Sequence, residues 1–341
     1  MKKYLLLMSI TIISMPQQAA SQDSKLLMDK QGICKVVDWG VYTHFNCGFT
    51  KTETTFNYQK LNNIVTSVRQ NPVLAALKGF DLITTFFAEN CDPKFGYGIP
   101  ANIHFEFHTW SLFVKSGKEG RWDIEPPHWD IVVNDIRPFG NGQSYAVNKP
   151  NKDDCKPGFD FEKWKSATLK MREVFHTLGN KETLAPGIDV YGGDKIIIYN
   201  PDRPNYWLPV TVKEMYDIWF DYYRNDPDEI ASNMSIQMLE AEYAQISEAD
   251  RNKPAYFGGV ATLAQVNAQK TEQQFVRANP LYWNKQLSKG AVQIMSCVLP
   301  QDKKIITYEK EEALKYQGGS YHVYRFMETI DIKTLLPLIE R

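Results

Sequence analysis

The sequence lacks the features that place a protein in a membrane or on nucleic acid. After the apolar run at residues 4–13, no stretch approaches the roughly 18 consecutive apolar residues of a spanning helix. Acidic and basic side chains nearly balance, at 40 and 39, so the net charge is −1, and no basic run occurs. Attraction of nucleic acid or of an anionic membrane needs such an excess of positive charge. We therefore expect no nucleic acid partner and no transmembrane segment in the mature chain.

The short motifs of several enzyme classes are also missing. The sequence contains no nucleophile elbow, phosphate-binding P-loop, HExxH helix or EF-hand loop. The Gly-Tyr-Gly and Gly-Asn-Gly triplets at residues 96–98 and 140–142 do not open a helix in a βαβ unit, so they do not predict nucleotide binding. A candidate site must therefore be sought in clusters of side chains.

The first 21 residues have the pattern of a secretory signal peptide. Lys2 and Lys3 precede the apolar run, and the small residues 19–21 supply a cleavage site. We expect an exported protein, periplasmic or extracellular, whose mature chain begins near Gln22. Its net charge becomes −3 once the two lysines are removed.

Only five cysteines are present, and all lie in the part of the chain that would be exported, where disulfides persist. No CxxC pair or Cys/His array occurs, so neither a redox motif nor a structural zinc site is predicted. We expect one disulfide between Cys34 and Cys47, which flank a short hairpin pattern, and another between Cys91 and Cys155. Cys297 lies in an apolar run and is expected to be a buried thiol.

The apolar patterns predict an α+β protein with antiparallel or mixed sheets, packed helices and two subdomains. Helices precede meandering strands in the first half, and the second half again contains both. A stretch rich in Gly, Asn, Lys, Asp and Pro marks a boundary. The predicted divisions are the signal peptide 1–21, an N-terminal α+β domain 22–138, a linker 139–158 and a C-terminal α+β domain 159–341.

Several helix starts and one hairpin are predicted from local signals. Asn71 before Pro72, Asp160, and Thr211 in a capping box each have the side chain of an N-terminal cap, and the run at residues 226–229 starts another helix by the same logic. The helix that follows Asp160 is expected to run to residue 178, which would place His176 in its last turn with a structural role. Residues 187–199 are expected to form a hairpin around two glycines. Residues 321–327 are expected to be a strand and residues 331–339 a closing helix.

The clearest strand pattern lies at residues 101–135. Apolar and polar residues alternate from 103 to 108, as in a strand with one buried and one polar face. The apolar residues then move to even positions from Trp110, which predicts a β-bulge near His108 or Thr109. A turn at residues 115–120 and a second arm, interrupted by Pro126 and Pro127, complete a hairpin.

Ionisable side chains gather on the polar face of this hairpin. A hairpin that turns about Lys118 without slip would place His108 opposite His128 and Glu106 opposite Asp130. Facing carboxylates repel unless a cation or a proton lies between them. We therefore predict a divalent metal or acid–base site, with His104, Glu106, His108 and His128 as metal ligands and Glu106 or Asp130 as catalytic base. In a strand His104 and His108 lie about 13 Å apart, too far for both to reach one zinc ion. The alternative is a solvated sheet face without a function.

A stiff loop at residues 200–209 is a second candidate site. It contains three prolines and presents Arg203, Tyr206 and Trp207 as ligand-binding residues, and such loops often carry binding residues. Tyr282 and Trp283 could add further rings for stacking on a sugar or a peptide. The alternative is that Trp207 fills the core and that Arg203 is a surface charge.

Two classes of function fit these observations. The first, which needs fewer coincidences, is a non-catalytic exported protein that binds a carbohydrate, a peptide or an envelope partner through the loop aromatics. The second is a metal-dependent or carboxylate-driven hydrolase, in which an ion held by the hairpin cluster activates water. Exposed tryptophans would favour binding, whereas carboxylates and histidines that converge in a cleft would favour catalysis.

Overall fold

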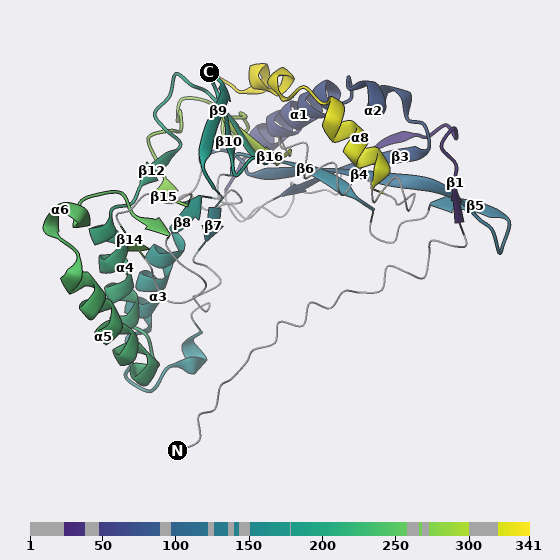
Figure 1. The fold of residues 1–341 in the computed structure, drawn as a ribbon. Coiled ribbons are helices and arrows are strands. Elements are labelled where there is room, and N and C mark those ends of the chain that lie inside the picture. Colours follow the sequence, from purple (N-terminus) through teal and green to yellow (C-terminus); the bar gives the residue numbers. More distant parts are fainter. Residues whose placement is uncertain are drawn as a thin grey trace.

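A large mixed sheet forms the body of the protein in its computed structural model (Figure 1). The structure describes residues 24–37, 48–88, 97–121, 126–135, 140–142, 151–177, 179–257, 266–267, 273–299 and 320–341. Eight of the described strands follow the order β2-β3-β4-β6-β16-β11-β10-β9, and β1 and β5 also pair with β4. The bounds are β1 Ser24–Leu26, β2 Cys34–Val37, β3 Phe80–Ala88, β4 Ala101–Phe113, β5 Lys118–Arg121, β6 His128–Val133, β9 Lys181–Ala185, β10 Ile188–Tyr191, β11 Lys195–Tyr199 and β16 Ile294–Val298.

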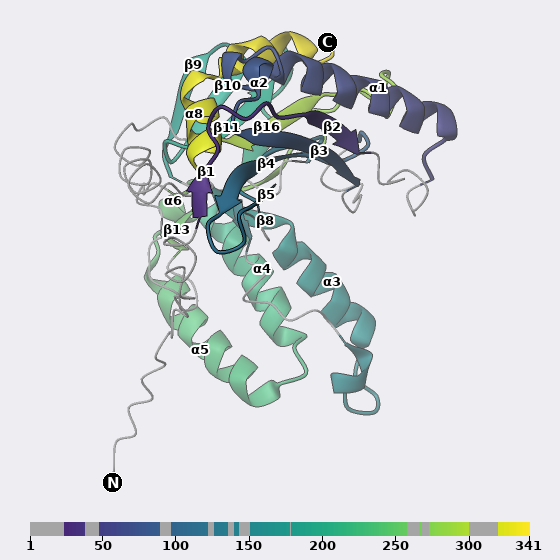
Figure 2. The same cartoon turned by 90° about the vertical axis from the view of Figure 1, so that its right-hand side faces the viewer.

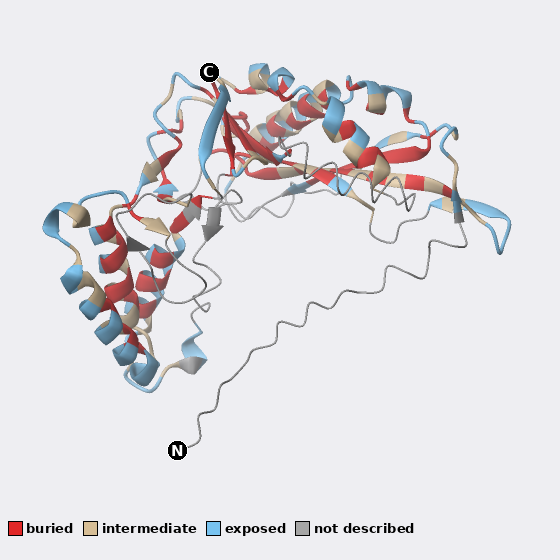
Figure 3. Cartoon of the chain, viewed as in Figure 1, coloured by how far each residue is buried: buried red, intermediate tan, exposed pale blue. Residues whose placement is uncertain are grey.

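Helices from both ends of the described chain cover one face of this sheet (Figure 1). They are α1 (Lys51–Val68), α2 (Pro72–Ala76), α8 (Tyr321–Thr329) and the 3-10 helix η6 (Ile332–Leu338). The main hydrophobic core lies between these helices and the strands, with Phe105, Phe107, Trp129 and Phe326 among its largest members. Figure 3 shows most of the central strands as buried. Every second residue of β4 faces this core, which leaves the other face of the strand for polar side chains.

A smaller sheet and a layer of helices make up the rest of the described chain. The sheet has the order β12-β15-β8-β7 and lies between the large sheet and the helices α3, α4 and α5 (Figures 1 and 2). Its strands are β7 Gly140–Gly142, β8 Val174–Thr177, β12 Trp207–Pro209 and β15 Phe275–Ala278. The helices are α3 Phe161–Arg172, α4 Val212–Arg224 and α5 Glu229–Gln245, and the short elements are η5 Lys152–Asp154, α6 Glu248–Arg251, β13 Tyr256–Phe257 and β14 Val266–Asn267. Apolar side chains of α3, α4 and α5, such as Tyr216 and Trp219, form a second core.

The predicted helix starts and the glycine hairpin are present. Asn71 and Asp160 cap α2 and α3, and Thr211 forms a complete capping box with Glu214 at the start of α4. The side chain of Asp228 accepts a hydrogen bond at the start of α5. Strands β10 and β11 pair as an antiparallel hairpin. Each of these helix caps and turns depends on residues a few positions apart in the chain, so it can form without contacts to distant segments.

Two predicted elements are wrong in type. Residues 174–177 do not extend the helix that Asp160 begins, because they pair as β8 with β15 and β7. Residues 321–329 form helix α8 rather than a strand. The buried residues of that helix are His322, Val323 and Phe326, which have helical spacing, so the aromatic residues around them suggested a strand on propensity alone.

The expected α+β class with mixed sheets is confirmed. Strand β6 pairs with β16, so the large sheet takes strands from both sides of the predicted linker at 139–158. The division into domains stays a prediction, and the proposed signal peptide lies outside the described residues. Among the described helices, none combines the length and the apolar composition that crossing a bilayer requires.

Candidate functional site

The ionisable cluster on the polar face of β4 and β6 exists, but in a register that differs from the predicted one. His104 lies opposite Asp130, and Glu106 lies opposite His128. The predicted pairs, His108 with His128 and Glu106 with Asp130, are therefore wrong. The correct register places a carboxylate opposite an imidazole in both pairs, so the two carboxylates do not face one another.

The register differs because the two arms of the hairpin have unequal lengths. Trp110 pairs with Arg121 in β5, whereas Glu106 pairs with His128 in β6. Between these pairs β4 advances four residues and the other arm advances seven, so the second arm has three extra residues. The turn lies at residues 114–117, where Gly117 has φ +63°, and is therefore earlier than the predicted centre.

The predicted β-bulge near His108 or Thr109 is also wrong. The pairing of β4 with β3 is continuous from residue 101 to residue 109, and the alternation of buried residues continues through Thr109 and Ser111. Small hydroxyl side chains occupy the core side there, and Trp110 lies on the other face. The indole of Trp110 donates a hydrogen bond to Asp81 at 3.0 Å, and the Lys30 amine lies 3.7 Å from its ring centre. Because Asp81 and Lys30 contact the Trp110 ring on that face, the strand needs no bulge to turn this ring toward the core.

His104 is at the centre of the polar contacts on this face. Its Nδ1 lies 2.5 Å from Asp130 Oδ1, and its Nε2 lies 3.3 Å from Glu106 Oε1. The other oxygen of Glu106 lies 2.9 Å from His108 Nε2, and the rings of His104 and His128 have centroids 4.3 Å apart. Burial opposes the charged imidazole, but the hydrogen bond and charge of Asp130 and the charge of Glu106 raise the pKa of His104 above its ordinary value.

The loop at residues 200–209 contributes to the interior of the protein and to a pocket. Tyr206 and Trp207 are 2% and 5% exposed, and Tyr282 and Trp283 are buried in the same aromatic core. Arg203 donates hydrogen bonds to the Gln293 side chain at 2.5 Å and to the Glu340 carbonyl at 2.7 Å. The guanidinium therefore connects the loop to Gln293, the residue before β16, and to Glu340 near residue 341.

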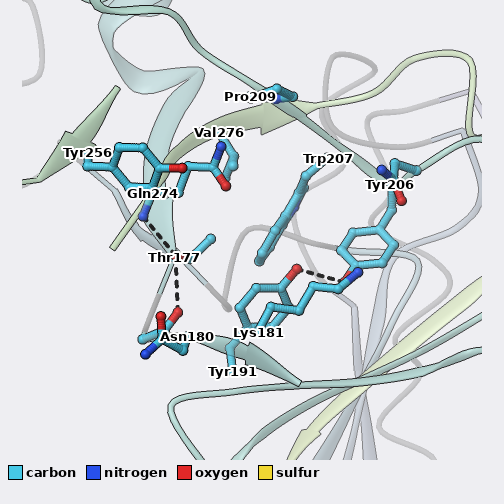
Figure 4. Close-up of a pocket in the computed structure, with 12 residues that line it drawn as sticks. Thr177, Asn180, Lys181, Tyr191, Tyr206, Trp207, Pro209, Tyr256, Gln274 and Val276 are labelled. Atoms are coloured by element: carbon cyan, nitrogen blue, oxygen red, sulfur yellow. Dashed lines mark hydrogen bonds between the residues drawn. The ribbon is translucent and has the colours of Figure 1, made fainter. Parts of the chain in front are cut away.

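Tyr206 and Trp207 line a pocket of about 360 Å³ at the junction of the two sheets (Figure 4). Figure 4 shows the ring of Trp207 in the middle of the pocket, between Gln274 and Tyr256 on one side and Tyr206 and Lys181 on the other. The pocket is lined by Thr177, Gly179, Asn180, Lys181, Tyr191, Asn205, Tyr206, Trp207, Pro209, Tyr256, Gln274 and Val276.

A buried carboxylate, Asp189, contacts two residues of the pocket wall, Lys181 and Tyr206. Asp189 of β10 is completely buried, and its two oxygens accept hydrogen bonds from Thr183 and Tyr206, each at 2.7 Å. The amine of Lys181, whose side chain is 41% exposed, lies 2.8 Å from the same carboxylate and balances its negative charge. The hydroxyl of Tyr206 also lies 2.9 Å from that of Tyr191. Burial, followed by the neighbouring tyrosine and the negative charge of Asp189, holds the pKa of Tyr206 well above its ordinary value, so this hydroxyl stays protonated.

Trp207 carries a buried polar group that has no partner among the described residues. Its indole Nε1 is buried and makes no hydrogen bond to any described residue. Most buried polar groups in proteins are hydrogen-bonded, so an unpaired indole N–H in the wall of a pocket needs an explanation. A ligand that offers an acceptor there is one such explanation.

Most of the residues that line this pocket have no local signal in the sequence. The amides of Asn180, Asn205 and Gln274 and the amine of Lys181 come from separate segments that only strand pairing brings together. One signal was available: Asp189 is the single charged residue of the four-residue strand β10, and a carboxylate is rarely fully buried without partners.

The cysteine predictions are only partly within the described residues. No disulfide joins two described cysteines, and Cys47 and Cys91, the predicted partners of Cys34 and Cys155, lie outside these residues. Both disulfides therefore stay predictions. Burial raises the pKa of the Cys34 thiol, and it raises that of the fully buried Cys297 further, so Cys297 is an unreactive thiol.

Comparisons of the chain with protein-family models, with curated proteins and with solved structures give no match. A proposal of function must therefore be based on the geometry of the pocket around Trp207 and of the cluster around His104.

Proposed function

We propose that the protein is a non-catalytic binding protein for a carbohydrate and that the pocket around Trp207 holds the ligand. The observation that carries this proposal is the buried indole N–H of Trp207, which has no hydrogen-bond partner among the described residues and belongs to a residue of the pocket wall. The nitrogen itself is buried, so an acceptor from a ligand would satisfy it once the Trp207 ring turns toward the ligand. The gain is the desolvation cost of one unpaired group, about 1–3 kcal/mol.

The chemistry of the wall supports a sugar as that ligand. Amides from Asn180, Asn205 and Gln274 can donate and accept hydrogen bonds, as sugar hydroxyls also do. The rings of Tyr256 and Trp207 offer apolar surface for the C–H face of a pyranose. A pocket with both kinds of group fits a ligand that is polar at its rim and apolar on its faces.

The charge and size of the pocket narrow the choice. Its cation, Lys181, already pairs with Asp189 at 2.8 Å, so the pocket has little net charge to offer to an anion. Its volume of about 360 Å³ is near the small end of the 300–1,000 Å³ range of ligand pockets. A neutral sugar of one or two units is therefore favoured over a peptide segment.

The test is a binding screen with neutral mono- and disaccharides, followed through the indole N–H signals of the protein in ¹⁵N NMR spectra. Trp207→Phe removes the N–H, keeps a ring and identifies the Trp207 signal. We expect a sugar that shifts this signal, and about a 5- to 150-fold weaker affinity in the variant, which corresponds to the 1–3 kcal/mol gained by pairing the N–H.

Trp283→Phe is the matched control. Trp283 is 7% exposed in the same aromatic core but does not line the pocket, so the variant should bind the sugar with unchanged affinity. Asn180→Ala changes an exposed residue of the wall and should weaken binding without loss of stability. The proposal fails if no sugar of the panel shifts the Trp207 signal, or if the Trp207 and Trp283 variants bind the sugar equally well.

A further inference from the structure

We infer that His104, His128 and Asp130 form a binding site for a divalent transition-metal ion on the polar face of β4 and β6. This site is separate from the sugar pocket and does not depend on it. One ligand atom from each of the three residues lies within 4.8 Å of the other two. Ligand atoms around one tetrahedral zinc ion, at about 2.0–2.1 Å from the metal, lie about 3.3 Å from one another.

Only a small movement separates the present arrangement from a closed set of ligands. His104 and Asp130 are direct partners across the two strands and are already in contact at 2.5 Å. The side chain of His128 is 52% exposed, and its Nε2 lies 3.8 Å from Asp130 Oδ2. Rotation of this exposed ring about its side-chain bonds can bring His128 to the ion, and the contact between His104 and Asp130 must lengthen from 2.5 Å to about 3.3 Å to admit it.

The charges around the cluster favour a cation. Asp130 and Glu106 are partly buried, at 34% and 24% exposure, and both contact imidazoles. Among the described residues, no Lys or Arg forms an ion pair with either carboxylate. Two carboxylates that have no fixed cation beside them and lie close to imidazole nitrogens are a suitable environment for a doubly charged ion.

The donor atoms select the class of metal. Imidazole nitrogen suits Zn²⁺, Cu²⁺, Ni²⁺ and Fe²⁺, whereas Ca²⁺ and Mg²⁺ prefer a shell of oxygen atoms. Two histidines and one carboxylate are a common set of three protein ligands for zinc, and they leave a fourth position for water or another ligand. His108 contacts Glu106 at 2.9 Å and is not among the three residues whose ligand atoms lie within 4.8 Å of one another.

The test is a titration of metal-free protein with Zn²⁺ alone, by isothermal calorimetry, on the full mature chain purified without a histidine tag. We expect one Zn²⁺ per chain in the wild type and no comparable uptake of Mg²⁺ or Ca²⁺. His128→Ala and Asp130→Asn each remove one ligand. Loss of a group that only orients a ligand already weakens metal binding about 10- to 100-fold, so these variants should bind Zn²⁺ at least about 100-fold more weakly.

His108→Ala is the matched control, because it removes a histidine from the same strand and the same face but not from the set of three. It should bind one Zn²⁺ with an affinity close to that of the wild type. A second measurement needs no variant: in spectra of ¹⁵N-labelled imidazoles, Zn²⁺ should shift the ring nitrogens of His104 and His128 and leave those of His108 nearly unchanged.

Two results would overturn the inference. The first is a wild-type protein that takes up no stoichiometric Zn²⁺ and shows no imidazole shifts. The second is equal binding by the wild type and by folded His128→Ala and Asp130→Asn variants, which would place the ion elsewhere in the protein.

Discussion

His322, at the start of α8, should make the stability of the protein depend on pH. Its side chain is 4% exposed, its ring centroid lies 4.5 Å from that of Phe80, and its Nε2 makes no hydrogen bond to any described residue. Burial, and then the positive charge of Arg325, lower the pKa of this imidazole from 6.5 to about 4. The folded protein therefore keeps His322 neutral, because a charged imidazole could not be solvated there.

The direction of the effect follows from the two states of the chain. In the unfolded chain the imidazole titrates near pH 6.5, so between pH 6.5 and pH 4 the unfolded chain binds a proton that the folded protein does not. The free energy of unfolding therefore decreases as the pH falls through this window. The full pKa difference corresponds to about 3 kcal/mol, of which about 2 kcal/mol is lost by pH 5. Above pH 6.5 and below pH 4 this residue contributes no further change.

The variant His322→Leu removes the titrating group and leaves no polar atom unpaired in its place. We would measure the free energy of unfolding of both proteins in urea at pH 7.5 and pH 5.0, followed by tryptophan fluorescence. Other groups titrate equally in both, so the stability of the wild type relative to that of the variant should fall by about 2 kcal/mol between these pH values. Arg325→Gln, which removes the nearby positive charge from an exposed position, should reduce the acid loss by a smaller amount.

The reasoning is refuted if the wild type and His322→Leu lose the same free energy of unfolding between pH 7.5 and pH 5.0. That result would mean that His322 accepts a proton in the folded protein without cost, either because its ring reaches water or because it has a partner that stabilises the imidazolium. A change in the urea m-value of only one protein would instead point to a change in the unfolded state.

Three further predictions concern stability and can be measured by urea unfolding at pH 7.5. Asp189→Asn removes the buried charge that pairs with an amine and accepts two hydroxyl hydrogen bonds, and should cost about 3 kcal/mol; a cost below about 1 kcal/mol would contradict the network. Gly32→Ala should cost more than about 3 kcal/mol or prevent folding, because the added Cβ would lie 1.8 Å from the Phe80 carbonyl oxygen, whereas Gly117→Ala has open space and should cost only about 1–2 kcal/mol for its positive φ. Thr211→Ala removes the N-terminal cap of α4 and should cost about 1 kcal/mol, and an unchanged midpoint would show that the cap is dispensable.

The predicted helix starts, which depend only on neighbours in the chain, were confirmed for this protein. The capping box at Thr211 needs only Glu214, three residues later, and the start of α2 needs only Asn71 before Pro72. Both signals satisfy backbone N–H groups that any helix leaves unpaired at its start, so the rest of the fold cannot remove their advantage.

Predictions that depend on register failed, although the strands themselves were predicted. The alternation at residues 101–108 identified β4, and the aromatic and polar residues near it identified a hairpin. The alternation within one strand, however, does not show how many unpaired residues the partner strand contains. Because the second arm has three extra residues, His128 pairs with Glu106 and not with the predicted His108. This change of register also changes which side chains can share a metal ion.

The two candidate sites differ in how much of each the sequence could reveal. The metal candidates His104, His128 and Asp130 belong to one hairpin, so a local pattern brought them to attention together. The pocket takes its wall from residues between 177 and 276, and only the pairing of β8, β15 and β12 unites them. Separations of that size leave no periodic signal, because periodicity reports which face a residue occupies and not which distant segment it meets.

A buried charge is the feature by which such a pocket could be found from sequence. Asp189 stands between Ile188 and Val190 in a strand that is buried along its whole length. An unpaired carboxylate there would cost several kcal/mol, so the strand is stable only where donors converge on it. In this protein one donor is the Tyr206 hydroxyl, which lies 2.7 Å from the Asp189 carboxylate. This hydrogen bond holds Tyr206 in place, and Trp207 is the next residue in the chain. A lone carboxylate in an apolar strand thus predicts a polar network of distant residues. In this protein two residues of that network, Lys181 and Tyr206, also line the pocket.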